Sequence, residues 1–354
     1  MHVHVTLRPP KPTRGYDIYW SFASERQKVY RRRLDHQSGP LTDDPVIAAH
    51  RFTNAYRASD RVSQYLIANV IYDTDRPWVD TFARILIFKI FNRVDTWCHL
   101  QRLLGEVSSD TLMAEQVDDA LESRAARWPI YSAAYIMPPP RNGTGAKFRR
   151  HLELIRSMIR GVAHERIAES PNMQSAFAAL ASYDSIGPFL AYQFLTDLNY
   201  SPFLSFSETE FVAPGPGALR GLRKCIADPG DYGAHDVIRW VMDAQEAAFA
   251  DRGLEWTDLW GRPLQLIDIQ NLFCEVDKYT RAAHPELSAL APGKRIKQRY
   301  RAVSTPLSAW FPPKWGVNDA IPARYRTGGP AFESNSRPQL FPIASPAAPT
   351  TRSS

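Results

Sequence analysis

Apolar side chains recur at helical spacing along most of the chain, and no long stretch alternates between apolar and polar residues as a strand would. From about residue 78 to residue 97, apolar residues occupy nearly every side of the predicted helix, which indicates a helix surrounded by other elements. The pattern therefore predicts an all-α fold, and no internal repeat is visible. The predicted helices cover about 16–34, 45–72, 78–97, 147–160, 172–182 and 188–199.

One helical domain is expected between two segments that lack this pattern. The chain has 354 residues, enough for one large domain or two closely packed lobes, and we assign residues 15–326 to it. Residues 1–14 contain Pro and Arg and are expected to be flexible. Residues 327–354 are rich in Pro, Ser, Thr and Ala. They bury too little apolar surface to offset chain entropy, so we expect a disordered tail.

The charge and the cysteines narrow the class of protein. A formal net charge of +6 is compatible with nucleic-acid binding, although many other enzymes reach it. Cys98, Cys225 and Cys274 are scattered without C-x-x-C spacing, which argues against a disulfide framework and against a cysteine zinc site. No apolar stretch reaches the roughly 18 residues that span a bilayer, and no signal peptide is visible. We therefore expect a cytoplasmic protein without a metal or another cofactor.

A polar stretch around Arg57 is the first candidate for contact with DNA. Guanidinium and amide groups on one helix face suit the recognition of phosphates or base edges. The alternative is a solvated polar face on which Asp60 pairs with an arginine. The polar residues that would share one face of a continuous helix are Asn54, Arg57, Arg61 and Gln64.

A predicted tight turn between two helices is the second candidate. Gly187 stands at its apex, where a residue without a side chain would let backbone N–H groups approach a phosphate. Helix-hairpin-helix DNA binders use such a turn, but their usual second glycine is replaced here by Ser185, and Pro188 lacks an N–H donor. The alternative is an ordinary Gly-Pro helix start.

A glycine-rich loop before a basic helix is the third candidate. Glycines at a helix N-terminus form anion sites, and cations on the helix would add positive charge. The loop is not a phosphate loop of the nucleotide-kinase type, because the Gly-Lys-Ser/Thr ending is missing here and elsewhere in the sequence. The alternative is a tight structural loop. The residues in question are Gly215, Gly217, Arg220 and Lys224.

A polar line on an otherwise apolar helix is the candidate catalytic element. Asp268, Asn271 and Glu275 follow each other at three- and four-residue spacing among Leu, Ile, Phe and Val side chains. Carboxylates in apolar surroundings acquire raised pKa values, which suits acid–base chemistry. Lys278 could neutralise a phosphate, or it could form an ordinary ion pair with Glu275.

These clusters together resemble a family of DNA base-hypermodification proteins. The family comprises the α-glutamyl/putrescinyl-thymine pyrophosphorylases and the helical domain of 5-hydroxymethyldeoxyuridine (5-hmdU) DNA kinases. The resemblance implies an all-helical fold related to helix-hairpin-helix DNA glycosylases, and work on 5-substituted pyrimidines in phage-type DNA inside a bacterial host cell. The matching stretches are 52–67, 85–97, 186–201, 206–222 and 266–279, with the helix around Trp20 and Glu25.

One departure concerns the catalytic carboxylate. Helix-hairpin-helix glycosylases usually carry an aspartate where this chain has Pro-Gly-Pro-Gly at 214–217. The nearest carboxylates are Glu208 and Glu210. If the resemblance extends to glycosylase chemistry, the carboxylate must come from one of these or from the Asp268 helix.

Three functions remain open at this stage, all with double-stranded DNA containing modified pyrimidines as partner. The main hypothesis is a DNA glycosylase that flips out and excises a modified base. The alternative is a group transferase, such as a kinase, acting on a 5-hydroxymethyl pyrimidine. The second alternative is a non-catalytic DNA-binding module. Basic helices at 147–160 and 217–224 support DNA binding in each case, and the oligomeric state stays open.

Overall fold

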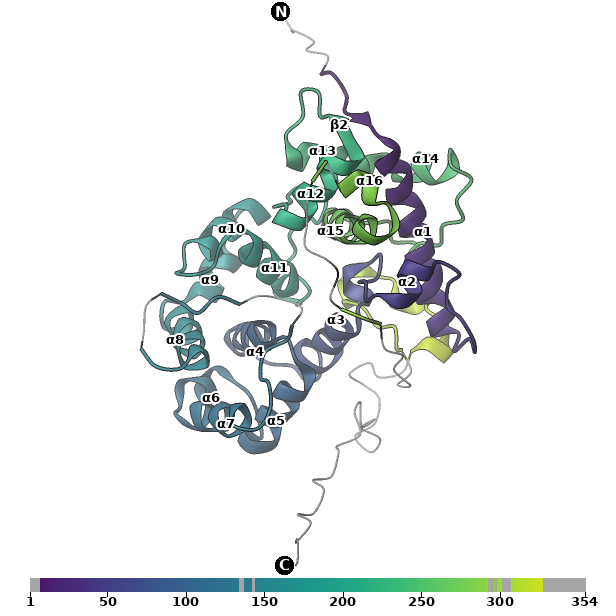
Figure 1. Ribbon diagram of the computed structural model, residues 1–354. Helices are drawn as coiled ribbons and strands as arrows, with labels where there is room; N and C mark the ends of the chain where they lie inside the picture. The colour runs from purple at the N-terminus through teal and green to yellow at the C-terminus, as the bar shows by residue number, and fades with distance from the viewer. Residues whose placement is uncertain are drawn as a thin grey trace, which may run out of the picture.

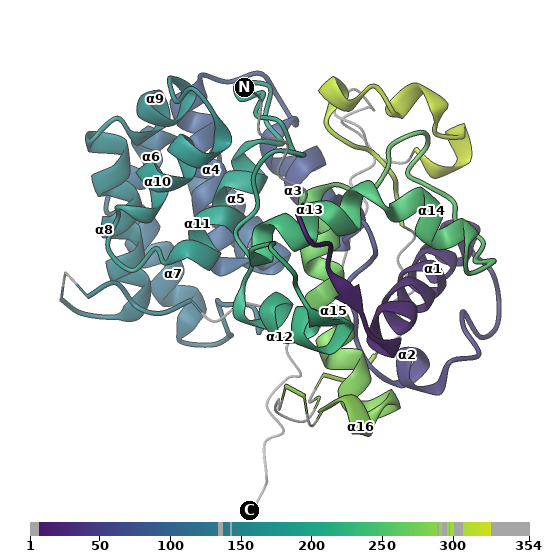
Figure 2. The ribbon, with the colours of Figure 1, turned by 90° about the horizontal axis from the view of Figure 1, so that it is seen from above.

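The computed structural model describes residues 7–133, 137–141, 144–288, 290–291, 296, 298–300 and 307–326. These residues form an all-α fold, as predicted, with one short antiparallel ribbon in which β1 (Lys11–Pro12) pairs with β2 (Ile226–Asp228). Two lobes stand side by side (Figures 1 and 2). The middle of the chain builds one lobe, and its two ends build the other.

The first lobe surrounds α4 (Trp78–Phe91), whose residues from Thr81 onward are all buried. Apolar residues on every side of this helix require neighbours on every side, which explains its central place. The helices around it include the strongly amphipathic α8, which lays an apolar stripe onto the lobe. They are α5 (Val94–Leu104), α6 (Ser109–Met113), α7 (Gln116–Ala125), α8 (Lys147–Arg160), α9 (Ala163–Ala168), α10 (Met173–Ala181) and α11 (Pro188–Leu198).

The second lobe is built around α15 (Leu266–Ala283). Glycines allow α12 to pack very closely between two neighbours. A Cβ atom on Gly221 would lie 2.1 Å from the carbonyl oxygen of Phe273, and one on Gly15 would lie 2.2 Å from that of Lys224. The other helices of the lobe are α1 (Arg14–Leu34), α2 (Pro45–Ala49), α12 (Pro216–Cys225), α13 (Ala234–Asp243), α14 (Gln245–Ala250) and α16 (Pro285–Ser288).

Besides residues 199–215, which lead from α11 to α12, two described segments join the lobes. The first runs through η1 (Arg57–Ser59), α3 (Arg61–Leu66) and the π-helix η2 (Ile67–Ile71) into α4. The second, 307–326, contains three short 3₁₀ turns, η3 (Pro313–Trp315), η4 (Asn318–Ala320) and η5 (Ala323–Tyr325). Its Lys314 donates to the carbonyl oxygens of Asn199, Ser201 and Leu204. The 307–326 segment thereby fastens the end of the first lobe to the second.

Some predicted boundaries are wrong. The helix predicted over 45–72 ends at Ala49. A mostly extended segment, which contains η1, follows as far as Asp60, where α3 begins. The helix predicted over 78–97 ends at Phe91, where Asn92 adopts a left-handed conformation (φ 49°) and a second helix starts. Residues 11 and 12, predicted to be flexible, form a strand, while the tail from 327 lies outside the described residues. No helix within the described ranges is long and apolar enough to cross a membrane.

Candidate functional site

The extended segment 51–60 lies against α15 and is tied to it by two carboxylates. Asp268 accepts hydrogen bonds from the backbone N–H of Arg57 (2.7 Å) and from that of Gln265 (3.1 Å). About two helical turns further along, Glu275 accepts one from the N–H of Thr53 (3.2 Å). These bonds satisfy backbone donors of a segment that is extended apart from the short 3₁₀ turn η1. The polar line predicted on α15 therefore positions the 51–60 segment.

Asp268 is buried, and both its carboxyl oxygens are used by backbone donors. It stands in the first turn of α15, where a carboxylate caps the helix start. Desolvation is the largest influence on this carboxyl group and raises its pKa to about 6, although the two N–H donors oppose that shift. The shift agrees with the raised pKa expected from the sequence. The catalytic role of Asp268 stays a prediction, since its oxygens have a structural task.

We expect the stability of the wild-type protein to fall, relative to Asp268→Asn, as the pH rises from 4 to 7. A raised folded-state pKa means that the contribution of Asp268 is fully present below its ordinary value of 3.8 and is lost as the pH rises through about 6. The expected difference is on the order of 2 kcal/mol. Urea denaturation of both proteins across this pH range measures it. A pH-independent difference would show that Asp268 does not titrate here.

Glu275 and Lys278 form the ion pair that was the simpler interpretation of their spacing, with 3.1 Å between Oε2 and Nζ. Lys278 also donates to the carbonyl oxygen of Arg51, and its ammonium lies 4.6 Å from the centre of the Phe52 ring. The ammonium group of Lys278 therefore stabilises the start of the 51–60 segment. Asn271, between the two carboxylates, is half-buried, and its amide has no partner among the described residues.

The prediction that the polar residues around Arg57 share one face of a continuous helix is wrong. Asn54 lies in the extended segment, Arg57 in a 3₁₀ turn and Arg61 at the start of α3. The amide of Asn54 is buried between Arg26 and the carbonyl oxygen of Ser59. Gln64 is likewise buried, and bonds the carbonyl oxygen of Ala58 and the N–H of Trp310. Neither amide can reach a base edge.

Arg57 belongs to a buried charge cluster between the lobes. Its guanidinium lies 2.6 Å from a carboxylate oxygen of Asp197 and donates to the hydroxyl of Tyr200. The second oxygen of Asp197 lies 2.9 Å from the ammonium of Lys89. Burial alone would raise the pKa of Asp197, but the two cations outweigh it and hold the pKa below its usual value. The prediction that Arg57 contacts DNA is therefore wrong.

Arg61 is partly exposed, whereas Asn54, Arg57 and Gln64 are buried. Burial lowers the pKa of Arg61, and the positive charges of Arg51 and Arg33 lower it further, so both lie close enough to repel the guanidinium of Arg61. No carboxylate pairs with Arg33 or Arg51 in the part of the chain that the structure describes. We name Arg33, Arg51 and Arg61 the arginine cluster. Positive charge gathered in this way is typical of an anion-binding surface.

Sequence reasoning selected only Arg61 from this arginine cluster. Arg51 heads the same polar stretch, and Arg33 ends the Arg-Arg-Arg run of α1. The signal that could have found them is their lack of a nearby acidic residue at helical spacing. Their proximity depends on how α1 packs beside the 51–60 segment.

The glycine loop before α12 is structural. A Cβ atom on Gly215 would lie 2.5 Å from the ring of Phe189, and one on Gly217 would lie 3.1 Å from the sulfur of Cys274. Lys224, predicted to contact DNA, is fully buried and lies 2.9 Å from Asp277. That prediction is wrong because α15 covers the helix face concerned. Arg220 is partly exposed and pairs with the same carboxylate at 3.0 Å.

The predicted turn joins α10 to α11, and Gly187 is exposed at its end. Gly187 has ordinary extended angles (φ −71°, ψ 168°), and nothing lies within 4 Å of a Cβ atom built on it. The left-handed residue is Ser185 (φ 61°), at the position where the usual hairpin has its other glycine. Asp184 accepts a hydrogen bond from the N–H of Arg141 at 2.7 Å. The turn is therefore accessible, and its phosphate contact stays a prediction.

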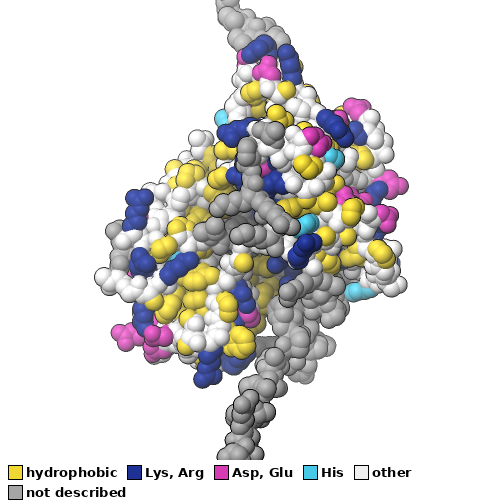
Figure 3. All heavy atoms as spheres, in the orientation of Figure 1, with side chains coloured by type: hydrophobic (Ala, Val, Ile, Leu, Met, Phe, Trp, Pro, Cys, Tyr) yellow, Lys and Arg dark blue, Asp and Glu magenta, His cyan; other side chains and the backbone are white. Residues whose placement is uncertain are grey.

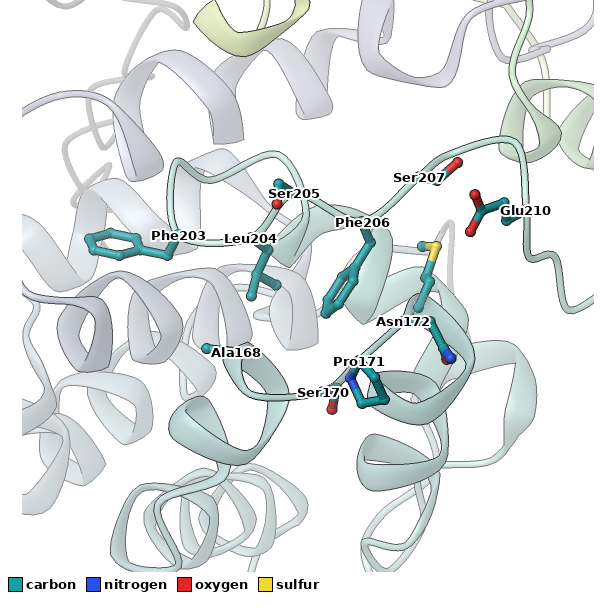
Figure 4. A pocket seen from close by; sticks show the side chains of 11 residues that line it. Ala168, Ser170, Pro171, Asn172, Phe203, Leu204, Ser205, Phe206, Ser207 and Glu210 are labelled. Carbon is teal, nitrogen blue, oxygen red and sulfur yellow. The ribbon is translucent and has the colours of Figure 1, made fainter.

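The two remaining carboxylate candidates differ in their position relative to the polar line on α15. Glu208 lies near Asp268, because its charge raises the pKa of that carboxyl group and its carbonyl oxygen accepts from the N–H of Leu266 at 3.3 Å. Glu208 pairs with Arg262 at 2.9 Å and accepts from the indole N–H of Trp315. Glu210 lines a cavity of about 240 Å³ between residues 168–173 and the 203–210 loop, where its carboxylate lies at one end, beyond Phe206 (Figure 4). The structure thus does not bring Glu210 together with Asp268 or Glu275. Within the described ranges, no group of His, Cys, Asp or Glu side chains could hold a metal ion.

Comparison with known proteins identifies the family to which this helical architecture belongs. Residues 13–289 match the family described as "5-hmdU DNA kinase, helical domain", which covers α1 to α16. The chain belongs to this family. A relative in it is the 5-hmdU DNA kinase of Bacillus phage SP10, which is 25% identical over 308 residues. The alignment covers 80% of this chain and 48% of the relative, so the chain spans about half the length of that kinase. No solved structure matches the chain.

Membership of the 5-hmdU DNA kinase helical-domain family confirms the resemblance seen in the sequence. It also corrects the main functional hypothesis. The hypothesis of a DNA glycosylase is wrong, because the matched family and the relative are both described as 5-hmdU DNA kinases, and kinases transfer a phosphoryl group. The group-transferase alternative agrees with them. The relation to helix-hairpin-helix glycosylases stays a prediction.

Proposed function

We propose that this chain is the DNA-binding helical part of a transferase that phosphorylates the 5-hydroxymethyl group of 5-hmdU in DNA. The match of residues 13–289 to the helical domain of 5-hmdU DNA kinases carries the proposal. The kinase of Bacillus phage SP10 adds support, since its alignment extends over most of this chain. Acting on phage-type DNA, the protein would work in the cytoplasm of a bacterial host.

The charges of the second lobe support the binding of DNA. The arginine cluster comes from three segments, and Arg51 is exposed. Each guanidinium offers several donors that match two phosphate oxygens at once. Figure 3 shows Lys and Arg side chains beside α2 and also at the outer edge of the α8 lobe. A duplex that lies across this face would meet cations on both lobes.

The reaction itself is an ordinary phosphoryl transfer. The hydroxyl oxygen of the modified uracil attacks the terminal phosphorus of a nucleoside triphosphate, and the bond from that phosphorus to the diphosphate breaks. The hydroxyl proton passes to a proton acceptor (a general base). The 5-hydroxymethyl group of the paired base projects into the major groove, and the enzyme must hold the nucleotide so that this group meets the triphosphate. Presenting that nucleotide is the task we assign to this chain.

The affinity of the protein for duplex DNA is expected to fall steeply between about 50 and 200 mM salt, because each phosphate that the protein neutralises releases counterions. A duplex with one 5-hmdU is expected to bind roughly tenfold more tightly than its thymine counterpart, the scale of one base contact. Fluorescence anisotropy measures both, with the thymine duplex as the matched control. Equal affinity for both duplexes together with a flat salt response would contradict the proposal.

A further inference from the structure

A second cavity, of about 430 Å³, lies where the end of α15 and α16 meet Ile296 and Arg299. Its polar lining consists of His50, Arg281, Ser288 and Arg299. The volume exceeds the share of a single water molecule, about 30 Å³, more than tenfold. It can therefore hold a small group together with its hydration.

The lining of this cavity carries excess positive charge. Arg281 lies 3.5 Å from Asp277, but the same carboxylate also pairs with Arg220 at 3.0 Å and with Lys224 at 2.9 Å. Asp277 thus forms ion pairs with three cations. The other nearby carboxylate, Glu286, is directed to Arg14 and His284. In the part of the chain that the structure describes, no carboxylate pairs with Arg299.

Two buried polar atoms in the lining lack partners. Nδ1 of His50 and Oγ of Ser288 are buried and have no hydrogen-bond partner among the described residues. Such groups are rare in folded proteins and call for an explanation, often a bound group. His50 and Arg299 also pair as an isolated antiparallel bridge, so their side chains lie on the same side of it. The guanidinium of Arg299 and the imidazole of His50 are therefore held on the same side, toward the cavity.

This cavity is connected with the other elements that we assign to DNA. Residue 298, next to Arg299, accepts from the N–H of Arg51, a member of the arginine cluster, and donates to the carbonyl oxygen of Ala133. The N–H of Arg141 donates to Asp184 in the turn before α11. Arg281, Arg299 and the arginine cluster thus form neighbouring positive charges on the second lobe.

We infer that the cavity binds a phosphate group, with Arg281 and Arg299 as the charged ligands and His50 and Ser288 as hydrogen-bonding ligands. Arginine forks and hydroxyl groups are the donors that phosphate oxygens accept. The phosphate can belong to the DNA backbone, an identification that rests on the proposed function, or to a free phosphate compound. Apolar atoms of Pro285 and Ile296 beside the cations suit the sugar that accompanies a nucleotide phosphate.

The test compares Arg299→Gln and His50→Gln with Arg102→Gln as the control. Arg102 is exposed at the end of α5, in the other lobe, so Arg102→Gln and Arg299→Gln change the net charge equally. Duplex affinity is measured by anisotropy across salt concentrations, and the binding of inorganic phosphate by calorimetry. Melting temperatures show whether each variant is folded, and Arg299 is exposed, so we expect Arg299→Gln to fold normally.

If the cavity holds a backbone phosphate, both site variants lose roughly tenfold in duplex affinity, and Arg299→Gln lowers the salt slope by about one, while the control does neither. If it holds a free phosphate compound, duplex affinity stays constant and calorimetric phosphate binding is lost in the two site variants. Site variants that match the control in both measurements overturn the inference. Failure of the wild-type protein to bind any duplex would refute the proposed function, and the calorimetric arm would still decide the cavity.

Discussion

Replacing Asp197 by Asn is expected to lower the free energy of unfolding by about 3–5 kcal/mol, the scale for removing one partner of a buried ion pair. Asp197 is almost fully buried between Arg57 and Lys89, at 2.6 and 2.9 Å. Asparagine keeps the shape and removes the charge, so two buried cations lose their counterion. Since whole domains are stable by only about 5–15 kcal/mol, the loss is severe. Urea denaturation at neutral pH measures it.

Glu153→Gln provides the matched control. Glu153 pairs with Arg160 on the surface of α8, and both side chains are about half exposed. Solvent screens such a pair, and we expect a change within about 1 kcal/mol. Equal effects of the two substitutions would contradict the role assigned to the Asp197 cluster. Because Arg57 also begins the connection into α3, a destabilised Asp197→Asn protein is expected to lose DNA affinity as well.

Replacing Gly221 by Val is expected to be the most damaging change in the second lobe. Its Cβ atom would lie 2.1 Å from the carbonyl oxygen of Phe273, and a backbone atom of α15 cannot rotate away as a side chain can. The two helices must separate, which exposes apolar surface along their whole contact. Overpacking of a core costs about 1–3 kcal/mol and occasionally more, and we expect the upper end or failure to fold. Thermal denaturation and the yield of folded protein report the outcome.

Gly187→Val is the control for this substitution and also tests the hairpin turn. Nothing lies within 4 Å of a Cβ atom at Gly187, and its backbone angles suit any residue, so stability should change by less than about 1 kcal/mol. If the turn lies against a phosphate, duplex affinity falls although the protein stays folded. Unchanged affinity would remove the turn from the DNA surface. A folded and stable Gly221→Val protein would show that α12 and α15 are less tightly packed than described.

The arrangement gives α15 a central part in the proposed function. Its carboxylates hold the 51–60 segment, which carries Arg51, and its C-terminal end supplies Arg281 to the second cavity. A single rigid helix therefore sets the distance between the arginine cluster and the proposed phosphate site. Changes that loosen α15, such as Gly221→Val, should weaken duplex binding before they abolish folding.

The sequence by itself determined the elements whose signals are local. The amphipathic stripe predicted helix 147–160 with the observed boundaries, and proline at the first helical position marked the start of α11. The all-α class followed from the same periodicity. The family also followed from the sequence, because six short stretches matched together, and the comparison with known proteins confirmed it. Propensity and periodicity act over a few residues, so they can be read without a fold.

Only the tertiary structure decided which polar residues are available. Lys224 looked like a DNA ligand, yet its partner Asp277 lies 53 residues further along the chain. Arg57 is bound in the same way by residues of α11, such as Gln193, which is 136 residues away. Conversely, Arg33 and Arg51 are far apart in the sequence, and only the packing of α1 beside the 51–60 segment brings both close to Arg61. Burial and charge pairing depend on contacts between distant segments, and no local pattern encodes them.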